Sequence, residues 1–71
     1  MEIDIKIPFG KKVREIRLKR QLTQLDLATK LKTEPSQVGR IERAEISTSV
    51  SYAGKIANAL EVPVKDLFDF D

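Results

Sequence analysis

The spacing of apolar residues changes within the first twenty positions of the chain. Residues 2–7, Glu-Ile-Asp-Ile-Lys-Ile, alternate polar and apolar side chains up to a proline, which predicts a short strand. Because one strand is not stable alone, this strand needs a partner. Further along, Val13 and Ile16 recur at helical spacing and predict a helix over about residues 11–20.

Two helices follow, separated by a short turn. Thr23 suits the N-cap of a helix over Gln24–Leu31, and Asp26 falls in its first turn, near the positive end of the helix dipole. Pro35 fits the first position of the next helix, Pro35–Arg43, because the N–H that proline lacks would be unpaired there. The inner faces of the two helices carry apolar side chains: Leu27, Ala28, Leu31, Val38 and Ile41.

The last third of the chain predicts two more helices. Apolar residues at helical spacing mark a fourth helix: Val50, Ala53, Ile56, Ala57 and Leu60. Val62-Pro63 ends it, and residues 64–68 fit a short fifth helix. The predicted fold is all-α, with five short helices and a short N-terminal strand. We divide the chain into an N-terminal arm, residues 1–9, and one helical domain, residues 10–71.

Composition favours binding over catalysis. With 71 residues, a single small domain has little surface left to wall off a substrate pocket. The absence of cysteine and histidine excludes disulfides, thiolate nucleophiles and nearly all ordinary zinc sites. We therefore expect no enzyme activity, no metal and no cofactor. No apolar run approaches the roughly 20 residues of a membrane span, and the start of the chain lacks a secretion signal, so we expect a cytoplasmic protein.

Charge is unevenly distributed along the chain. Residues 1–43 hold eleven basic and six acidic side chains, a net charge of +5, whereas residues 44–71 hold two basic and five acidic ones, a net charge of −3. A basic half joined to an acidic half suggests that a polyanion binds one side and that the other side has a different role. The alternative is that the basic helix faces are merely solvated.

The two central helices have the features of a helix-turn-helix. Ala28 is small enough for the second helix to cross the first closely, so the second helix is held outward, where it fits a major groove about 12 Å wide. On this second helix, Arg40 is able to contact guanine in a bidentate manner and Gln37 to contact adenine. Ser36 reaches a base edge or a phosphate.

Four motifs are spaced along residues 10–68. They are Gly10-x-x-Val-Arg-x-Ile-Arg17, Leu22-Thr-Gln-x-x-Leu-Ala28, Val38-x-x-Ile-Glu-Arg43 and Ile56-Ala-x-Ala-Leu60. Together they resemble the Cro/cI-type (Xre) helix-turn-helix family, which includes phage repressors, restriction-modification controller proteins and many antitoxins. The resemblance implies a lambda-repressor-like domain that binds double-stranded DNA.

The resemblance also implies which positions contact DNA. They are Thr23, Gln24, Ser36, Gln37, Arg40, Arg43, Ser47 and Thr48. In the family, the glutamine at the start of the first motif helix bonds a phosphate and supports the recognition helix. Three positions on the exposed face of the recognition helix read base edges. Arg43 and the backbone of Ser47 and Thr48 match a phosphate clamp after that helix.

Other positions of the pattern are structural. Arg17 and Glu42 match an arginine–glutamate pair that ties the first helix to the third. Lys32 and Ala44 depart from the family, which usually has glycine at both positions. A left-handed residue other than glycine carries a cost of about 1 kcal/mol or more, unless the turn differs.

We interpret the chain as a transcriptional regulator, most often a repressor, that binds a palindromic operator as a homodimer. The alternative is an antitoxin or another protein-interaction module that uses the same fold to bind a protein partner. Two surfaces compete for the dimer contact. The first is a C-terminal apolar patch, Val62, Val64, Phe68 and Phe70, and the second is one side of the strand, Ile3, Ile5 and Ile7. Alternatively, the arm packs within its own chain, near Leu18 or against Phe68–Phe70.

Overall fold

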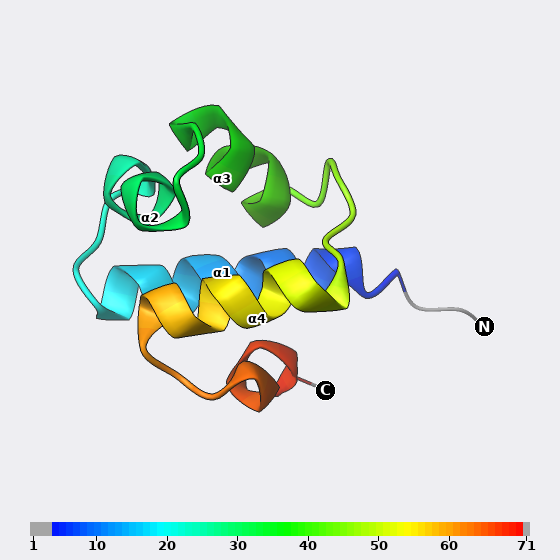
Figure 1. Ribbon diagram of the computed structural model, residues 1–71. Helices are drawn as coiled ribbons and strands as arrows, with labels where there is room; N and C mark the ends of the chain where they lie inside the picture. Colours follow the sequence, from blue (N-terminus) through cyan, green and yellow to red (C-terminus); the bar gives the residue numbers. More distant parts are fainter. Residues whose placement is uncertain (1–3, 71) are drawn as a thin grey trace.

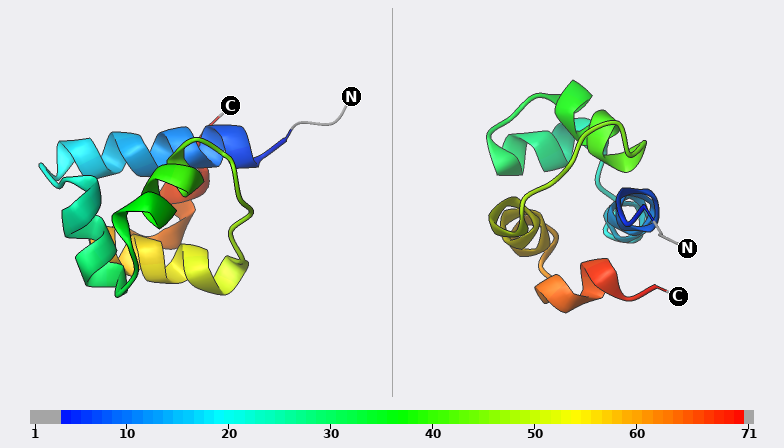
Figure 2. Two further views of the ribbon diagram at one scale, coloured as in Figure 1. Left: turned by 90° about the horizontal axis from the view of Figure 1, so that it is seen from above. Right: turned by 90° about the vertical axis from the view of Figure 1, so that its right-hand side faces the viewer.

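The computed structural model describes residues 4–70 as five helices in three layers (Figure 1). The helices are α1 (Lys6–Lys19), α2 (Gln24–Leu31), α3 (Pro35–Glu42), α4 (Val50–Leu60) and a 3-10 helix, η1 (Val64–Phe68). The pair α2 and α3 lies on one side of a layer made of α1 and α4, and η1 lies on the other side (Figure 2). The predicted all-α fold is confirmed. Within residues 4–70, no helix combines the length and apolar character that a membrane span requires.

The N-terminal end of α1 corrects one prediction. Residues 5–7, for which the alternating pattern predicted a strand, belong to the N-cap and first turn of α1. Ile5 has φ −64° and ψ −16°, and its carbonyl oxygen accepts a hydrogen bond from the N–H of Phe9 at 3.1 Å. The strand prediction is therefore wrong for these residues, and Ile3 lies outside the described part of the chain.

The physical reason is that a helix satisfies its backbone hydrogen bonds locally, whereas a strand needs a neighbouring strand, and residues 4–70 contain none. Pro8 falls in the first turn of α1, where its missing N–H has no helical partner to lose. Extending the helix also carries Phe9 into the interior, where only 5% of its surface remains exposed.

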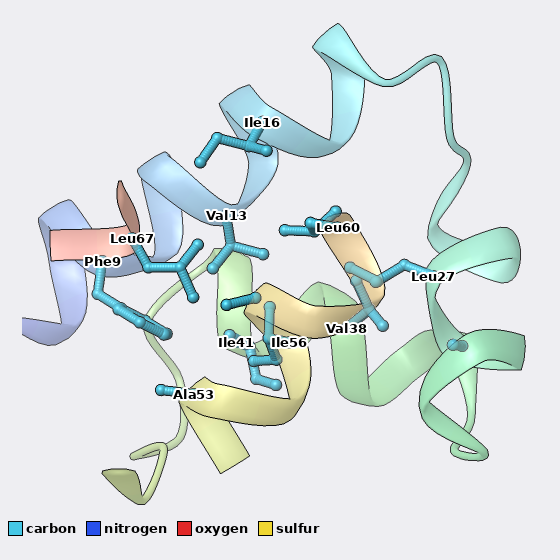
Figure 3. Close-up of a cluster of buried hydrophobic side chains, with 12 residues drawn as sticks. Phe9, Val13, Ile16, Leu27, Val38, Ile41, Ala53, Ile56, Leu60 and Leu67 are labelled. Carbon is cyan, nitrogen blue, oxygen red and sulfur yellow. The ribbon is translucent and has the colours of Figure 1, made fainter. Parts of the chain in front are cut away.

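The core draws apolar side chains from all five helices (Figure 3). Its buried members are Phe9, Val13, Ile16, Leu27, Ala28, Val38, Ile41, Ala53, Ile56, Ala57, Leu60 and Leu67. The helical spacing within each segment places them on one face, and full burial of such a side chain contributes about 1.5–3 kcal/mol. The predicted helices from Gln24 to Phe68 are confirmed, and α3 ends one residue earlier than predicted.

Each α-helix ends at a left-handed residue that is not glycine. The four residues have φ between 58° and 61°: Gln21, Lys32, Ala44 and Glu61. In each case, the N–H of the following residue donates to the carbonyl oxygen five positions earlier, as in Thr33 to Ala28 at 2.9 Å. This is the Schellman arrangement, which glycine usually completes. Lys32 and Ala44 thus adopt the left-handed conformation that family members use glycine for, at a cost of about 1–2 kcal/mol each.

Candidate nucleic-acid interface

One face of helix α3 packs against the core, and the opposite face is exposed to solvent. Val38 and Ile41 are 1% and 3% exposed and belong to the core. Ser36 and Arg40 are exposed and Gln37 is half-buried. Because residues three and four apart lie on the same side of a helix, Ser36, Gln37 and Arg40 form one outward group. The structure therefore presents the three residues predicted to read bases on a helix whose opposite side is fixed.

A groove runs between α3 and the loop that leads to α4. Hydroxyl and amide side chains line it together with apolar surface: Thr33, Gln37, Ile41, Ile46, Ser47, Thr48, Ser49 and Tyr52. The Ser49 hydroxyl caps α4 by accepting a hydrogen bond from the N–H of Tyr52 at 3.0 Å. The first turn of α4 carries no acidic residue, so its N–H groups and positive dipole end favour an anion such as phosphate. Ser47 and Thr48 thus lie in one groove with Gln37.

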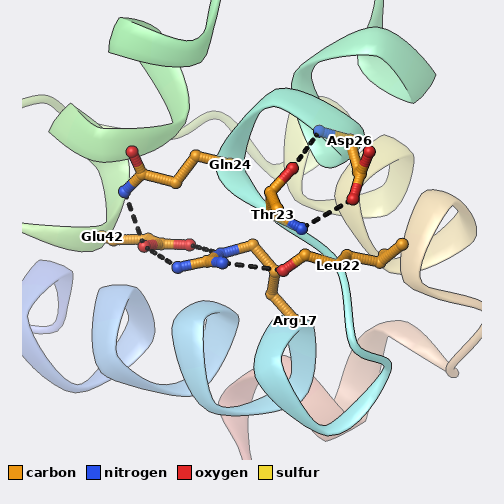
Figure 4. Close-up of polar contacts among 6 residues, drawn as sticks. All are labelled: Arg17, Leu22, Thr23, Gln24, Asp26 and Glu42. Atoms are coloured by element: carbon orange, nitrogen blue, oxygen red, sulfur yellow. Dashed lines mark hydrogen bonds and ion pairs between the residues drawn. The ribbon is translucent and has the colours of Figure 1, made fainter.

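A buried polar network joins α1, α2 and α3 (Figure 4). Arg17 and Glu42, only 6% and 9% exposed, form a bidentate pair: Nε donates to Oε2 at 2.6 Å and Nη2 donates to Oε1 at 3.0 Å. Arg17 Nη1 also donates to the carbonyl oxygen of Leu22 at 2.8 Å, and Gln24 Nε2 donates to Glu42 Oε1 at 3.2 Å. Every buried side-chain nitrogen and oxygen within residues 4–70 has a partner.

This network positions α3, the predicted recognition helix. Glu42 is the last residue of α3, so its carboxylate anchors the C-terminal end of that helix to Arg17 on α1. Paired charges of this kind hold a fixed geometry because guanidinium and carboxylate match at two points. Gln24, predicted to bond phosphate and to support the recognition helix, lies half-buried against the same carboxylate.

Thr23 is the N-cap of α2, as predicted, and completes a capping box (Figure 4). Its hydroxyl accepts from the N–H of Asp26 at 3.0 Å, and Asp26 Oδ2 accepts from the N–H of Thr23 at 2.8 Å. The hydrogen bond from the Thr23 backbone, and to a smaller extent the one from its side chain, holds the pKa of Asp26 below its usual value. The cap sets the start of α2, and with it the place of Gln24.

Gly10 lies where the backbones of α1 and α3 come close together. In the sequence it stood out only as the first residue of a motif. A Cβ atom on Gly10 would lie 2.5 Å from the carbonyl oxygen of Ile41 and 2.7 Å from that of Glu42. The backbones of α1 and α3 therefore come closer than any larger residue permits. The helix was predicted over about residues 11–20, so Gly10 lay just outside it, and only its place at the start of the first motif marked it in the sequence.

Arg43 and Glu45 form a pair just after α3 that the sequence reasoning did not anticipate. Arg43 Nε donates to Glu45 Oε2 at 2.7 Å, and both side chains are more than half exposed. The hydrogen bond from Arg43 holds the pKa of Glu45 below its usual value, and the same bond raises the pKa of Arg43. Arg43, predicted to clamp a phosphate, thus already holds a carboxylate.

The residues predicted to form the dimer surface lie near the start of α1 and around η1. Four of them remain exposed: Ile5 at 54%, Ile7 at 49%, Val64 at 44% and Phe68 at 40%. Val62 packs partly against the core. The Phe68 ring lies 5.1 Å from the Phe9 ring and 6.4 Å from the Phe70 ring, centroid to centroid. An apolar hollow between α1, η1 and the loop after α3 includes Ile5, Phe9 and Phe68 in its lining.

Metal ligands are not grouped in the described part of the chain: no three histidine, cysteine, aspartate or glutamate side chains between residues 4 and 70 are placed to hold an ion. The polar groups that line the α3 groove are instead hydroxyls and an amide, with the first turn of α4 beside them. Groups of this kind suit hydrogen bonding to phosphate and sugar oxygens.

Comparison with known proteins gives a consistent set of relatives. A helix-turn-helix family model matches residues 13–67. The control protein C.BamHI of Bacillus amyloliquefaciens is 39% identical over 71 residues, which cover 99% of this chain and 88% of C.BamHI.

Two solved structures share the architecture. The restriction-modification controller protein C.AhdI from Aeromonas hydrophila superimposes with a TM-score of 0.85 at 33% identity, covering 89% of this chain and 96% of C.AhdI. The clp gene regulator ClgR from C. glutamicum, at 22% identity, shares the fold with a TM-score of 0.89 over 94% of this chain and 87% of the ClgR chain.

Proposed function

Because the chain belongs to the Xre (Cro/cI-type) helix-turn-helix family, we propose that it is a transcriptional regulator that binds a palindromic operator as a homodimer. The observation that carries this proposal is the outward group of Ser36, Gln37 and Arg40 on a helix whose other face is buried. Regulation follows from occupancy of promoter DNA, with repression as its main effect. The likeness to C.AhdI, a restriction-modification controller protein, supports the genes of a restriction-modification system as targets.

In this proposal, the contacts divide into base reading and phosphate binding. The Arg40 guanidinium contacts guanine O6 and N7, and the Gln37 amide contacts adenine N6 and N7. The groove beside α3 takes the phosphate backbone, with Ser47, Thr48 and the first turn of α4 as donors. The buried Arg17–Glu42 pair keeps α3 at a constant angle to the rest of the domain.

The dimer places two copies of α3 on one face of the DNA. Successive major grooves on that face are about 34–36 Å apart, which sets the distance between the two recognition helices. We assign the dimer contact to η1 with help from the first turn of α1, since both leave apolar side chains exposed. The acidic side chains of the C-terminal segment, Glu61, Asp66 and Asp69, keep that surface away from the phosphates.

The base-reading role is tested with Arg40→Ala. We expect the variant to lose about 1–3 kcal/mol of specific binding and to relax its preference at one base position in each half-site. Selection from a randomised DNA pool measures the preference, and Arg14→Ala on α1, which also removes an exposed arginine, serves as the control. Identical sequences selected by Arg40→Ala and the wild type would exclude Arg40 as a reader.

The phosphate contacts predict a steep dependence on salt. The logarithm of the binding constant should fall by about 0.9 per contact for each unit of the logarithm of salt concentration. A flat salt response of the wild type would contradict DNA as the ligand.

The dimer surface is tested with Val64→Glu and Ile5→Glu. Each places a charge among exposed apolar side chains, so we expect weaker self-association at unchanged helix content. Sedimentation equilibrium measures the association, and Leu25→Glu, at a 60% exposed leucine on α2, is the matched control. If all three variants associate as the wild type does, the dimer contact lies elsewhere.

A further inference from the structure

Glu45 is held rigidly beside the two arginines of α3 and its C-cap. Its N–H donates to the carbonyl oxygen of Arg40 at 2.8 Å, and the N–H of Ala44 donates to the carbonyl oxygen of Ile41 at 3.1 Å. These two bonds close the left-handed turn at the end of α3. The carboxylate of Glu45 therefore projects from a fixed backbone and not from a loose loop.

The Arg43 side chain lies back along α3 toward Gly39. A Cβ atom on Gly39 would lie 2.8 Å from Arg43 Nη1, so the guanidinium occupies the space that the absent side chain leaves. Glu45 Oε2 holds the Nε side of that guanidinium at 2.7 Å. One edge of the cation is consequently occupied in the free protein.

We infer that Glu45 acts as an internal competitor of DNA: its carboxylate holds the guanidinium edge of Arg43 that a backbone phosphate takes in the complex. This inference rests on the proposed function, since it assigns a phosphate to Arg43. Carboxylate and phosphate oxygens bind a guanidinium through the same parallel N–H···O geometry, so both cannot use one edge at once. An exposed glutamate is ionised at neutral pH, and the hydrogen bond from Arg43 holds the pKa of Glu45 below its usual value.

The competition affects affinity and not sequence preference. A phosphate contact carries no sequence information, so a group that obstructs it weakens operator and non-operator DNA alike. When Arg43 turns to a phosphate, the carboxylate is left unpaired next to the DNA backbone and repels it. Glu45 therefore lowers the occupancy of DNA at a given protein concentration, so a higher concentration of the regulator is needed to fill the same site.

The test is Glu45→Gln, which keeps the shape of the side chain and removes its charge. The probes are a duplex that the wild type selects from a randomised pool and a scrambled duplex of equal length and composition. We expect both to bind about two- to fivefold more tightly, the range that an exposed ion pair accounts for. The salt dependence should steepen by up to about 0.9 per monomer, and the selected sequence should not change.

Two controls separate this mechanism from general charge effects. Glu15→Gln makes the same charge change on α1, where Glu15 pairs with Lys12 at 3.6 Å and Lys19 at 3.4 Å, and should give a smaller gain. In an Arg43→Ala background, Glu45→Gln should give a smaller gain, because only the repulsion between the carboxylate and the DNA backbone is left to relieve. Thermal melts of each variant without DNA verify that the fold is kept.

Several results would overturn the inference. Weaker binding by Glu45→Gln would mean that Glu45 positions Arg43 for DNA, and an altered selected sequence would mean that Glu45 reads a base. An equal gain in the Arg43→Ala background, or with Glu15→Gln, would mean simple repulsion. A wild type that selects no DNA overturns the proposed function, whereas a wild type that binds and a Glu45→Gln variant that binds equally well overturn only this inference.

Discussion

Replacing Arg17 with alanine should unfold much of the protein, because it leaves the buried carboxylate of Glu42 without its ion-pair partner. The change removes the two hydrogen bonds to Glu42, at 2.6 and 3.0 Å, and the bond to the carbonyl oxygen of Leu22 at 2.8 Å. The Glu42 side chain is 3% exposed and retains only the Gln24 amide at 3.2 Å. Removing one partner of a buried ion pair costs about 3–5 kcal/mol.

This loss is large relative to the stability of so small a domain. A chain of this length has a free energy of unfolding of about 4–11 kcal/mol. With an unfolding entropy of about 2.1 cal/mol/K per residue, the loss lowers the melting temperature by about 20–35 °C. We therefore expect a population of unfolded Arg17→Ala protein that is measurable near room temperature.

Thermal and urea denaturation followed by circular dichroism measure the effect. Arg14→Ala, at an exposed arginine of the same helix, should stay within a few degrees of the wild type. The double variant Arg17→Met, Glu42→Leu removes both charges and keeps apolar volume, so it should recover most of the loss. Wild-type melting of Arg17→Ala would refute the reasoning, and a double variant as unstable as the single one would place the loss in packing.

Four further substitutions have effects that follow from the structure. Gly10→Ala should lower the free energy of unfolding by about 1–3 kcal/mol, because its Cβ would lie 2.5 Å from a backbone oxygen of α3. Gly54→Ala, with open space around its Cβ, should raise it by about 1 kcal/mol, so the two urea midpoints should move in opposite directions. Lys32→Gly should raise the melting temperature, because glycine adopts the φ of 58° without strain. A lower melting temperature would mean that the lysine side chain stabilises the fold by more than the backbone strain destabilises it. Asp26 has a pKa below its ordinary value of 3.8, so its contribution to the free energy of unfolding is present above that value and is lost as the pH falls through the lower, folded-state pKa. Asp26→Asn should thus lose less stability than the wild type when melts are compared between about pH 7 and pH 2, and equal acid sensitivity would contradict this role of the capping box.

Much of the fold could be predicted from local signals in the sequence. Helical spacing, the N-cap at Thr23 and the proline at the start of α3 determined where α2 and α3 begin. These signals act between residues a few positions apart, so they can be recognised without knowing the fold. For the same reason, Ser36 and Arg40 could be assigned to the outward side of α3 once Val38 and Ile41 were assigned to the inward side.

Tertiary structure decided the features that depend on partners. Alternation in residues 5–7 suggested a strand, but burial of Phe9 within the domain favours a helix there. Arg17 and Glu42 are 25 residues apart, and their pairing was available only through a family resemblance. The approach of Gly10 to the α3 backbone and the hold of Glu45 on Arg43 were not predicted at all. Such contacts depend on how two backbones cross and how a turn aims its side chains, and the order of residues within one helix does not encode either.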